Sequence, residues 1–205
     1  MANTDFPRGL VPLDYPYMPV RAYRVSTGAD LFLGMPVERA ADGYIGPVAV
    51  SSLGAVQSIG VVVGFLGTMK RGLATNDPFL DVSDLTPPTP SSDTGDRYAL
   101  VADNPNQEFV IQGDTGGTLA ALADAGLAVN LIYRATSGNT DTGWANLEFD
   151  ASSSVASNSG ICQLSRLEDS INVDGTENTV AANYQRWIVR LLHHQNRSGL
   201  NPIPA

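Results

Sequence analysis

The chain has few of the residues that form covalent or metal cross-links. Its one cysteine, Cys162, excludes an intrachain disulfide and a cysteine metal cluster. Because Cys162 stands in an apolar run, the sequence predicts a buried, unreactive thiol. The two histidines, His193 and His194, are adjacent and on a strand would point to opposite faces, whereas metal ligands must converge on one point. We therefore expect no metal site and no cofactor.

Positive charge is also scarce. Lysine and arginine number 12 against 21 acidic residues, which gives a net charge of −9, and Lys70 is the only lysine. A nucleic-acid interface needs a clustered positive field, so we expect no nucleic-acid partner. An arginine-only cationic set suits fixed protein–protein contacts, because the planar guanidinium pairs bidentately with carboxylates. The codon usage of a GC-rich genome would produce the same composition.

Long apolar runs are missing as well. No window approaches the roughly 18 apolar residues of a membrane span. The start MANTDFPRGLVPL has no basic region followed by an apolar core, as a secretory signal would. We expect a chain that is made in a cytoplasm and enters no membrane.

Residues that favour turns are plentiful. Only 16% of the residues are charged, while glycine, proline, serine, threonine, asparagine and aspartate are frequent. Short runs such as Val61–Val63 are rich in β-branched residues, and glycines separate them. Tyr184–Leu192 fits both a strand and a helix by periodicity, but its β-forming residues favour a strand. The sequence predicts a mainly β protein with one short helix, which begins after Thr118 and ends at Gly126.

Residues 1–20 form an unusual opening segment. Four closely spaced prolines exclude a helix or a central strand, yet the segment is apolar and aromatic, unlike a disordered tail. We expect an extended N-terminal arm that lies in a groove of its own domain or of a neighbouring subunit. The alternative is an ordinary first strand of its own barrel. The candidate interface residues for a partner or a neighbouring subunit, all in this arm or just after it, are Phe6, Arg8, Leu10, Tyr15, Tyr17 and Arg21.

Residues 21–205 are expected to form a single domain with one long loop at 73–97. That loop carries four prolines and five aspartates and is too proline-rich for the interior of a sheet. The aspartates lack the spacing of a calcium-binding loop. Loops of this length inside a compact domain are usually functional or mobile, but the sequence assigns this one no contact.

The segment Tyr98–Asp114 consists of two short alternating runs around a polar break. The break contains Asp103, Asn104 and Pro105, whose side chains favour turns. It predicts a hairpin or a sharp structural corner between two strands, with Phe109 as the anchor on the far side. Nothing in this segment indicates a reaction centre.

No motif in the chain indicates an enzyme. The GxSxG signature of a serine nucleophile is absent. Three Asp-Thr-Gly triplets occur, at Asp93, Asp114 and Asp141, and superficially match an aspartic protease. In a chain so rich in glycine and aspartate we interpret them as turns, and we expect no catalytic residues.

Several pieces of the chain resemble, in order and over most of its length, a family of tailed-bacteriophage capsid cement (head decoration) proteins. The segment 73–97 departs from that pattern. The matching pieces are MANTDFPRGLVPL, Arg24-Val25, Leu31–Val37, Gly60–Phe65, Val101–Phe109, Tyr184–Arg190 and His194-Gln195.

The resemblance implies a jelly-roll-like or Greek-key β-barrel that is synthesised in the host bacterial cytoplasm and assembles on the outer capsid surface of the virion. There it would bridge major capsid protein subunits at local symmetry axes and stiffen the shell against the pressure of packaged DNA. A homo-oligomer is expected, with a trimer favoured over a dimer. The alternative function is that of a head-surface receptor-binding or carbohydrate-binding β-sandwich protein.

Overall fold

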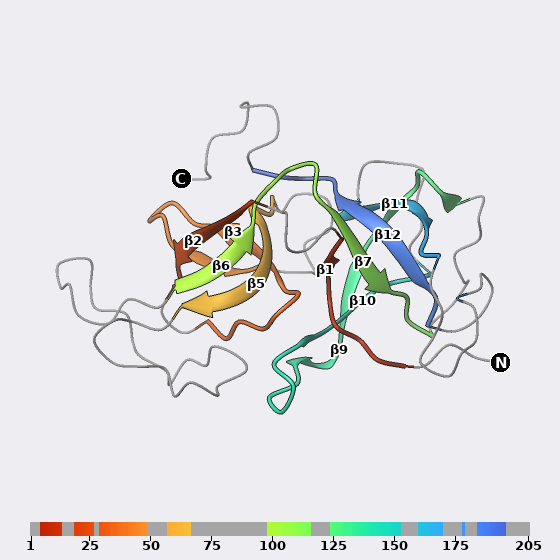
Figure 1. Cartoon of the computed structure of the whole chain (residues 1–205), viewed down its shortest axis with the longest axis horizontal. Helices are drawn as coiled ribbons and strands as arrows, with labels where there is room; N and C mark the ends of the chain where they lie inside the picture. The colour runs from red at the N-terminus through yellow and green to blue at the C-terminus, as the bar shows by residue number, and fades with distance from the viewer. Residues whose placement is uncertain are drawn as a thin grey trace.

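The computed structural model describes residues 5–13, 19–26, 29–48, 57–66, 98–115, 124–152, 160–169, 178 and 184–195. Over these residues the chain is mainly β, as the composition predicts, with twelve strands. Every pairing between two of these strands is antiparallel. The strands form two five-stranded sheets and a two-stranded hairpin, which lie side by side (Figure 1).

The first sheet is built around the predicted valine run. Val61 and Val62 are fully buried in its middle strand, and a bulge between Val62 and Gly64 bends that strand. An isolated bridge between Val25 and Ile45 links the first strand in the sheet order to the last. The order is β2 (Val20–Arg24), β6 (Tyr98–Ala102), β5 (Gly60–Leu66), β3 (Pro36–Arg39) and β4 (Ile45–Pro47).

The second sheet lies beside the hairpin. Its strand order is β1 (Val11–Pro12), β7 (Glu108–Gln112), β12 (Arg186–Leu191), β11 (Cys162–Leu167) and β8 (Ala128–Val129), and the hairpin is β9 (Leu131–Gly138) with β10 (Ala145–Phe149). One residue, Asn130, separates β8 from β9. A bridge between Gly113 and Phe149 ties the end of β7 to the end of β10. The strand predicted over Tyr184–Leu192 is confirmed as β12.

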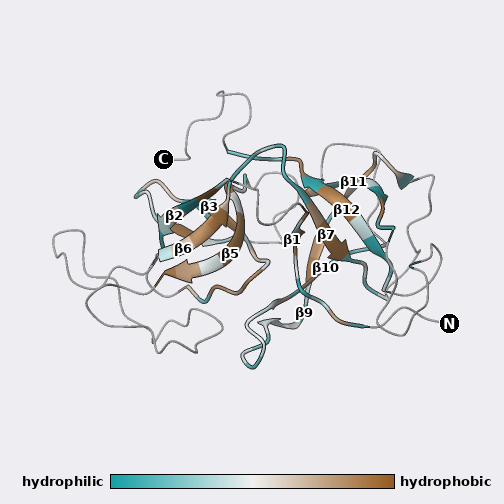
Figure 2. Ribbon diagram, viewed as in Figure 1, coloured by the Kyte–Doolittle hydropathy of each residue, from teal (hydrophilic) through white to brown (hydrophobic). Residues whose placement is uncertain are grey.

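Consecutive strands β6 and β7 belong to different sheets, so the turn between them is a corner and not a hairpin. Within it, the Asn104 side chain accepts a hydrogen bond from the Asn106 backbone N–H at 3.0 Å. The Tyr23 hydroxyl donates to the buried Asp103 carboxylate at 2.6 Å. The corner is hydrophilic, whereas β5 and β7 are largely hydrophobic (Figure 2). Phe109, just after the corner, is buried.

Most of the buried hydrophobic residues of both sheets belong to one cluster. Its largest members include Trp187, Phe149 and Phe109. Cys162 also belongs to the cluster, and its thiol is fully buried, as the sequence predicts. The described strands pair as two five-stranded sheets and a hairpin, and the single barrel expected from the sequence stays a prediction.

Besides the corner, backbone contacts between described residues link the first sheet to the second sheet and to the hairpin. The Leu10 backbone N–H donates to the Gly34 carbonyl at 2.9 Å, and Leu33 bridges to Trp144. After β12 the chain turns back, and the Ser58 backbone N–H donates to the His193 carbonyl at 2.8 Å (Figure 1). These crossings join strands that are far apart in the sequence.

Two predictions fall outside the described residues. The loop 73–97 lies there entirely, and so does most of the helix predicted from Thr118. Gly126, the expected helix end, is described and has a φ of 94°, the left-handed conformation that favours glycine at such an end.

Candidate functional site at the N-terminal segment

The described part of the predicted arm, residues 5–13, lies on its own chain. Val11 pairs with Val110 in the second sheet, and the Leu13 backbone N–H donates to the Glu108 carbonyl at 2.9 Å. Leu10 is fully buried in the shared core, with 0% of its surface exposed. This corrects the prediction that Leu10 contacts the capsid or another subunit, because no surface of it remains for a partner. The segment combines a short first strand with a stretch that lies over the second sheet.

Four polar side chains fasten the start of this segment, and we call them the clamp: Asp5, Gln112, Arg134 and Glu148. The Gln112 amide donates to Glu148 at 2.7 Å and to Asp5 at 3.1 Å. The Arg134 guanidinium pairs with Asp5 and with Glu148, at 2.7 Å from the latter. Gln112 on β7 and Arg134 on β9 hold Asp5 directly, and Glu148 on β10 holds these two side chains in place.

Glu148 is the centre of the clamp. Its side chain is 0% exposed, although its strand neighbours Leu147 and Phe149 point into the core on the opposite face. Burial raises the pKa of Glu148 from 4.5 to about 7, and nearby Asp5 and Asp114 add to the rise. The Gln112 hydrogen bond and the Arg134 charge lower it again in part. Glu148 can therefore exchange a proton near neutral pH.

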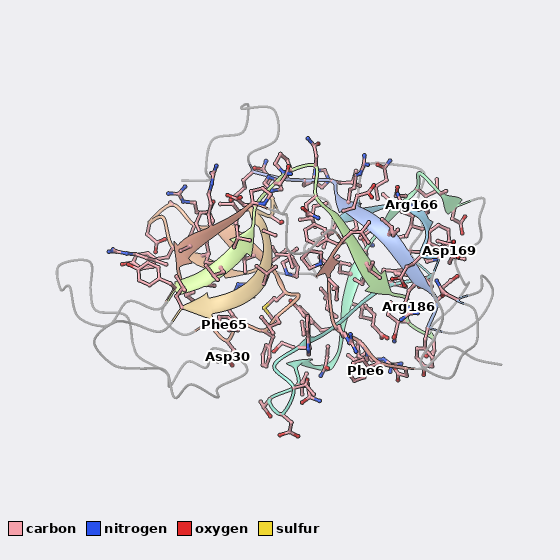
Figure 3. The ribbon with its side chains drawn as sticks, in the orientation of Figure 1. Phe6, Asp30, Phe65, Arg166, Asp169 and Arg186 are labelled. Atoms are coloured by element: carbon pink, nitrogen blue, oxygen red, sulfur yellow. The ribbon has the colours of Figure 1, made fainter. Side chains whose placement is uncertain are left out.

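Beside the clamp, Phe6 and Arg8 form an exposed pair. The Phe6 backbone N–H donates to the Gln112 side chain at 3.0 Å, which fixes the backbone, while 49% of the Phe6 residue surface stays exposed. The Arg8 guanidinium lies 4.5 Å from the centre of the Phe6 ring. Figure 3 places Phe6 at the surface beside β9. Arg8 is exposed, and no carboxylate of the described residues pairs with it.

The other predicted contacts do not join this pair. Arg21 lies on β2 of the first sheet, where its guanidinium is 3.4 Å from Asp103 at the corner. Tyr15 and Tyr17 lie outside the described residues. Of the described members of the predicted set, only Phe6 and Arg8 lie together.

The corner residues take structural positions. Asp103 is buried between Tyr23 and Arg21, and the Asn104 carbonyl accepts the Gln107 backbone N–H at 3.0 Å. Pro105 stands in the turn itself. Burial and the Asp103 contacts raise the pKa of Tyr23 to about 12, so its hydroxyl stays protonated as a donor.

Sequence reasoning missed the clamp. A glutamate between Leu147 and Phe149 on an alternating strand is expected to face solvent, and nothing local indicates that residues 5 and 6 will cover it. The only signal was the apolar character of the arm, which predicted a groove without locating it. Arg134 and Gln112 likewise resemble ordinary surface residues of a strand.

The described ranges contain no group of three acidic, histidine or cysteine side chains placed to hold a metal ion. His194 is buried where the chain crosses back to Ser58, and His193 is half-buried. No helix in the described part of the chain has the length and apolarity needed to span a bilayer. Compared with protein-family models, with curated proteins and with solved structures, the chain matches none.

Proposed function

We propose that this protein is a structural component of a phage virion that binds the outer surface of the capsid. It would cement neighbouring major capsid protein subunits, as a homo-oligomer with a trimer favoured, and so stabilise the shell against DNA pressure. The proposal rests on the ordered sequence pieces that resemble cement proteins. The Phe6–Arg8 pair supplies the contact.

The exposed Phe6–Arg8 pair is the structural observation that supports the proposed contact. Aromatic and arginine side chains dominate the binding energy of protein interfaces. The clamp already orders the backbone of Phe6, so binding would cost little further conformational entropy. Covering the exposed half of the Phe6 surface would contribute about 1 kcal/mol per copy. Such weak contacts become strong when many copies of an oligomer bind one shell.

The mechanism would be mass action. A protein that binds only the assembled, expanded lattice stabilises that lattice by its own binding free energy. No chemical step is needed, and the shared hydrophobic core of the two sheets provides the rigid support that bridging two subunits requires.

We further propose that the first sheet is barrel-like, and that the second sheet and the hairpin together are barrel-like. The Val25–Ile45 bridge supports closure of the first sheet. The Gly113–Phe149 bridge supports a ring of β7, β12, β11, β8, β9 and β10. Closure removes free strand edges, which would otherwise pair with other chains. The jelly-roll or Greek-key order of the connections stays a prediction.

The experiment is co-sedimentation of the purified protein with expanded capsids that lack it. We expect the wild type to pellet with capsids, and Phe6→Ala or Arg8→Ala to bind at least tenfold more weakly at an unchanged melting temperature. Deleting residues 1–20 would be a poor test, because it removes buried Leu10 from the core. The wild type staying in the supernatant would refute the proposal.

Matched controls come from the first sheet. Leu66 is an apolar residue with 41% exposure, and Arg39 is an exposed arginine. Leu66→Ala and Arg39→Ala remove similar groups from other surfaces, so both variants should bind capsids like the wild type. If the controls lose binding to the same extent, the contact does not lie at Phe6 and Arg8.

The receptor- or carbohydrate-binding alternative gains no support from the tryptophans. Sugar recognition commonly uses exposed aromatic faces. Trp187 is fully buried in the core, and Trp144 is half-buried at a crossing between the sheets.

A further inference from the structure

Two arginines share one carboxylate on the outer face of the second sheet. The Arg190 guanidinium donates to Glu108 Oε1 at 3.1 and 2.7 Å, and Arg166 Nη1 lies 3.2 Å from Glu108 Oε2. The side chains of Arg166 and Arg190 are 54% and 46% exposed, whereas that of Glu108 is 16% exposed. We call these three side chains the arginine-pair site.

The strand register explains why these residues meet. Glu108 on β7 lies opposite Arg190 on β12, and Arg166 on β11 lies opposite Ile188. Arg166 and Glu108 therefore reach toward each other across β12, over outward-facing Ile188, which is 5% exposed. Figure 3 shows Arg166 beside β11, on this side of the molecule.

The site keeps an unbalanced positive charge. Burial alone would raise the pKa of Glu108, but the hydrogen bonds and charges of Arg190 and Arg166 lower it overall, so the carboxylate stays ionised. Two guanidiniums and one carboxylate leave a charge of +1. A guanidinium has five N–H donors, and within the described residues Glu108 is the only ion partner of both arginines. Outward-facing donors thus remain on each of them.

The rest of the chain is acidic in sum: the whole chain carries −9 and the site +1, so the residues outside the site carry −10. Exposed ion pairs contribute little to the stability of their own fold, about 0–1 kcal/mol. Arginine is enriched at protein interfaces, because its fork binds carboxylates bidentately. The surface therefore suits a carboxylate-bearing partner, and any second copy presents one.

We infer that the arginine-pair site binds carboxylates on the acidic surface of a second copy of this chain. The contact joins two different surfaces and can close into a ring such as a trimer. The inference names a surface for the expected homo-oligomer and does not depend on capsid binding. The inference would still hold if the purified protein did not bind capsids but self-associated through this site.

The test is sedimentation velocity of the full-length protein over a range of concentrations and salt. The wild type should form a closed oligomer that dissociates as salt rises. Arg166→Gln and Arg190→Gln should each weaken association at least tenfold. Arg39→Gln, which removes the same charge from an exposed position on the first sheet, should not.

A further variant separates charge from structure. Glu108→Gln disrupts the local ion pairs but leaves both guanidiniums available, so association should be as strong as in the wild type or stronger. Equal weakening by all three substitutions at the site would indicate a merely structural role and overturn the inference. A monomeric wild type would overturn it too. The inference would also be overturned if the arginine variants associate like the wild type, even if they lose capsid binding.

Discussion

Replacing Glu148 by glutamine tests whether the clamp contains a carboxylate that the fold prefers to keep protonated. The substitution preserves the shape of the side chain and removes its charge. In the folded chain the pKa of Glu148 rises from 4.5 to about 7. A raised pKa means that the group stabilises the fold fully below pH 4.5, and that this contribution is lost as pH rises to about 7.

The magnitude follows from the width of that window. Between pH 4.5 and 7 the unfolded chain gives up the proton while the folded chain retains it, so the free energy of unfolding falls by about 1.4 kcal/mol per pH unit. Over the whole window the loss is about 3 kcal/mol. Glu148→Gln cannot lose this proton, so wild-type stability relative to the variant should fall by about 3 kcal/mol from pH 4.5 to 7.5.

The assay is urea unfolding followed by circular dichroism at several pH values. Glu108→Gln is the matched control, because the pKa of Glu108 is lowered in the folded chain. The stabilising contribution of Glu108 is present above its ordinary pKa and is lost only as pH falls below it. The difference in free energy of unfolding between the wild type and Glu108→Gln should therefore stay constant from pH 5 to 7.5. If the difference between the wild type and Glu148→Gln is also constant with pH, the pKa of Glu148 is not raised in the clamp and the reasoning is refuted.

Further substitutions test the packing. Gly34 has a φ of 80°, and a Cβ there would overlap the backbone oxygen of Arg8, so Gly34→Ala should lower the free energy of unfolding by about 3 kcal/mol or more in urea titrations. Gly126→Ala is the control, because Gly126 also has a positive φ, of 94°, but no atom lies within 4 Å of the added Cβ. Gly126→Ala should therefore lower the free energy of unfolding by only about 1 kcal/mol. Equal losses for the two variants would exclude the overlap at Gly34. Phe109→Ala should cost about 3–5 kcal/mol, because it leaves a cavity in the core, and an unchanged melting temperature would contradict that. Burial raises the pKa of Cys162, so its thiol should react with a thiol reagent only after unfolding, and prompt reaction of the native protein would contradict its burial.

Much of the strand content could be predicted from local pattern. The valine run of β5 and the Trp187-containing run of β12 are rich in β-forming residues, and the glycines and prolines around them exclude long helices. The break at Asp103–Asn106 was recognisable as a turn. Whether it was a hairpin or a corner depends on which partners β6 and β7 choose, and those partners are distant in the sequence.

The candidate site was only partly predictable. The apolar, proline-rich start indicated a segment that needs a groove, and Phe6 and Arg8 were named as contacts from it. Leu10 has the same local character but meets Gly34 and the core, and local sequence does not distinguish a buried leucine from an exposed one. Glu148 could not be recognised, because its burial depends on a segment more than a hundred residues earlier in the chain.

The return of the chain to Ser58 after β12 affects how the protein can fold during synthesis. The backbone of Ser58 is held by His193 and Gln195, so this segment is completed only by residues that leave the ribosome much later. Contacts of such large sequence separation slow folding, because the loop must close before they form. The nascent chain therefore has to remain incompletely folded until residues 193–195 have been synthesised, and a ribosome that stops before residue 193 releases a chain in which Ser58 lacks these partners.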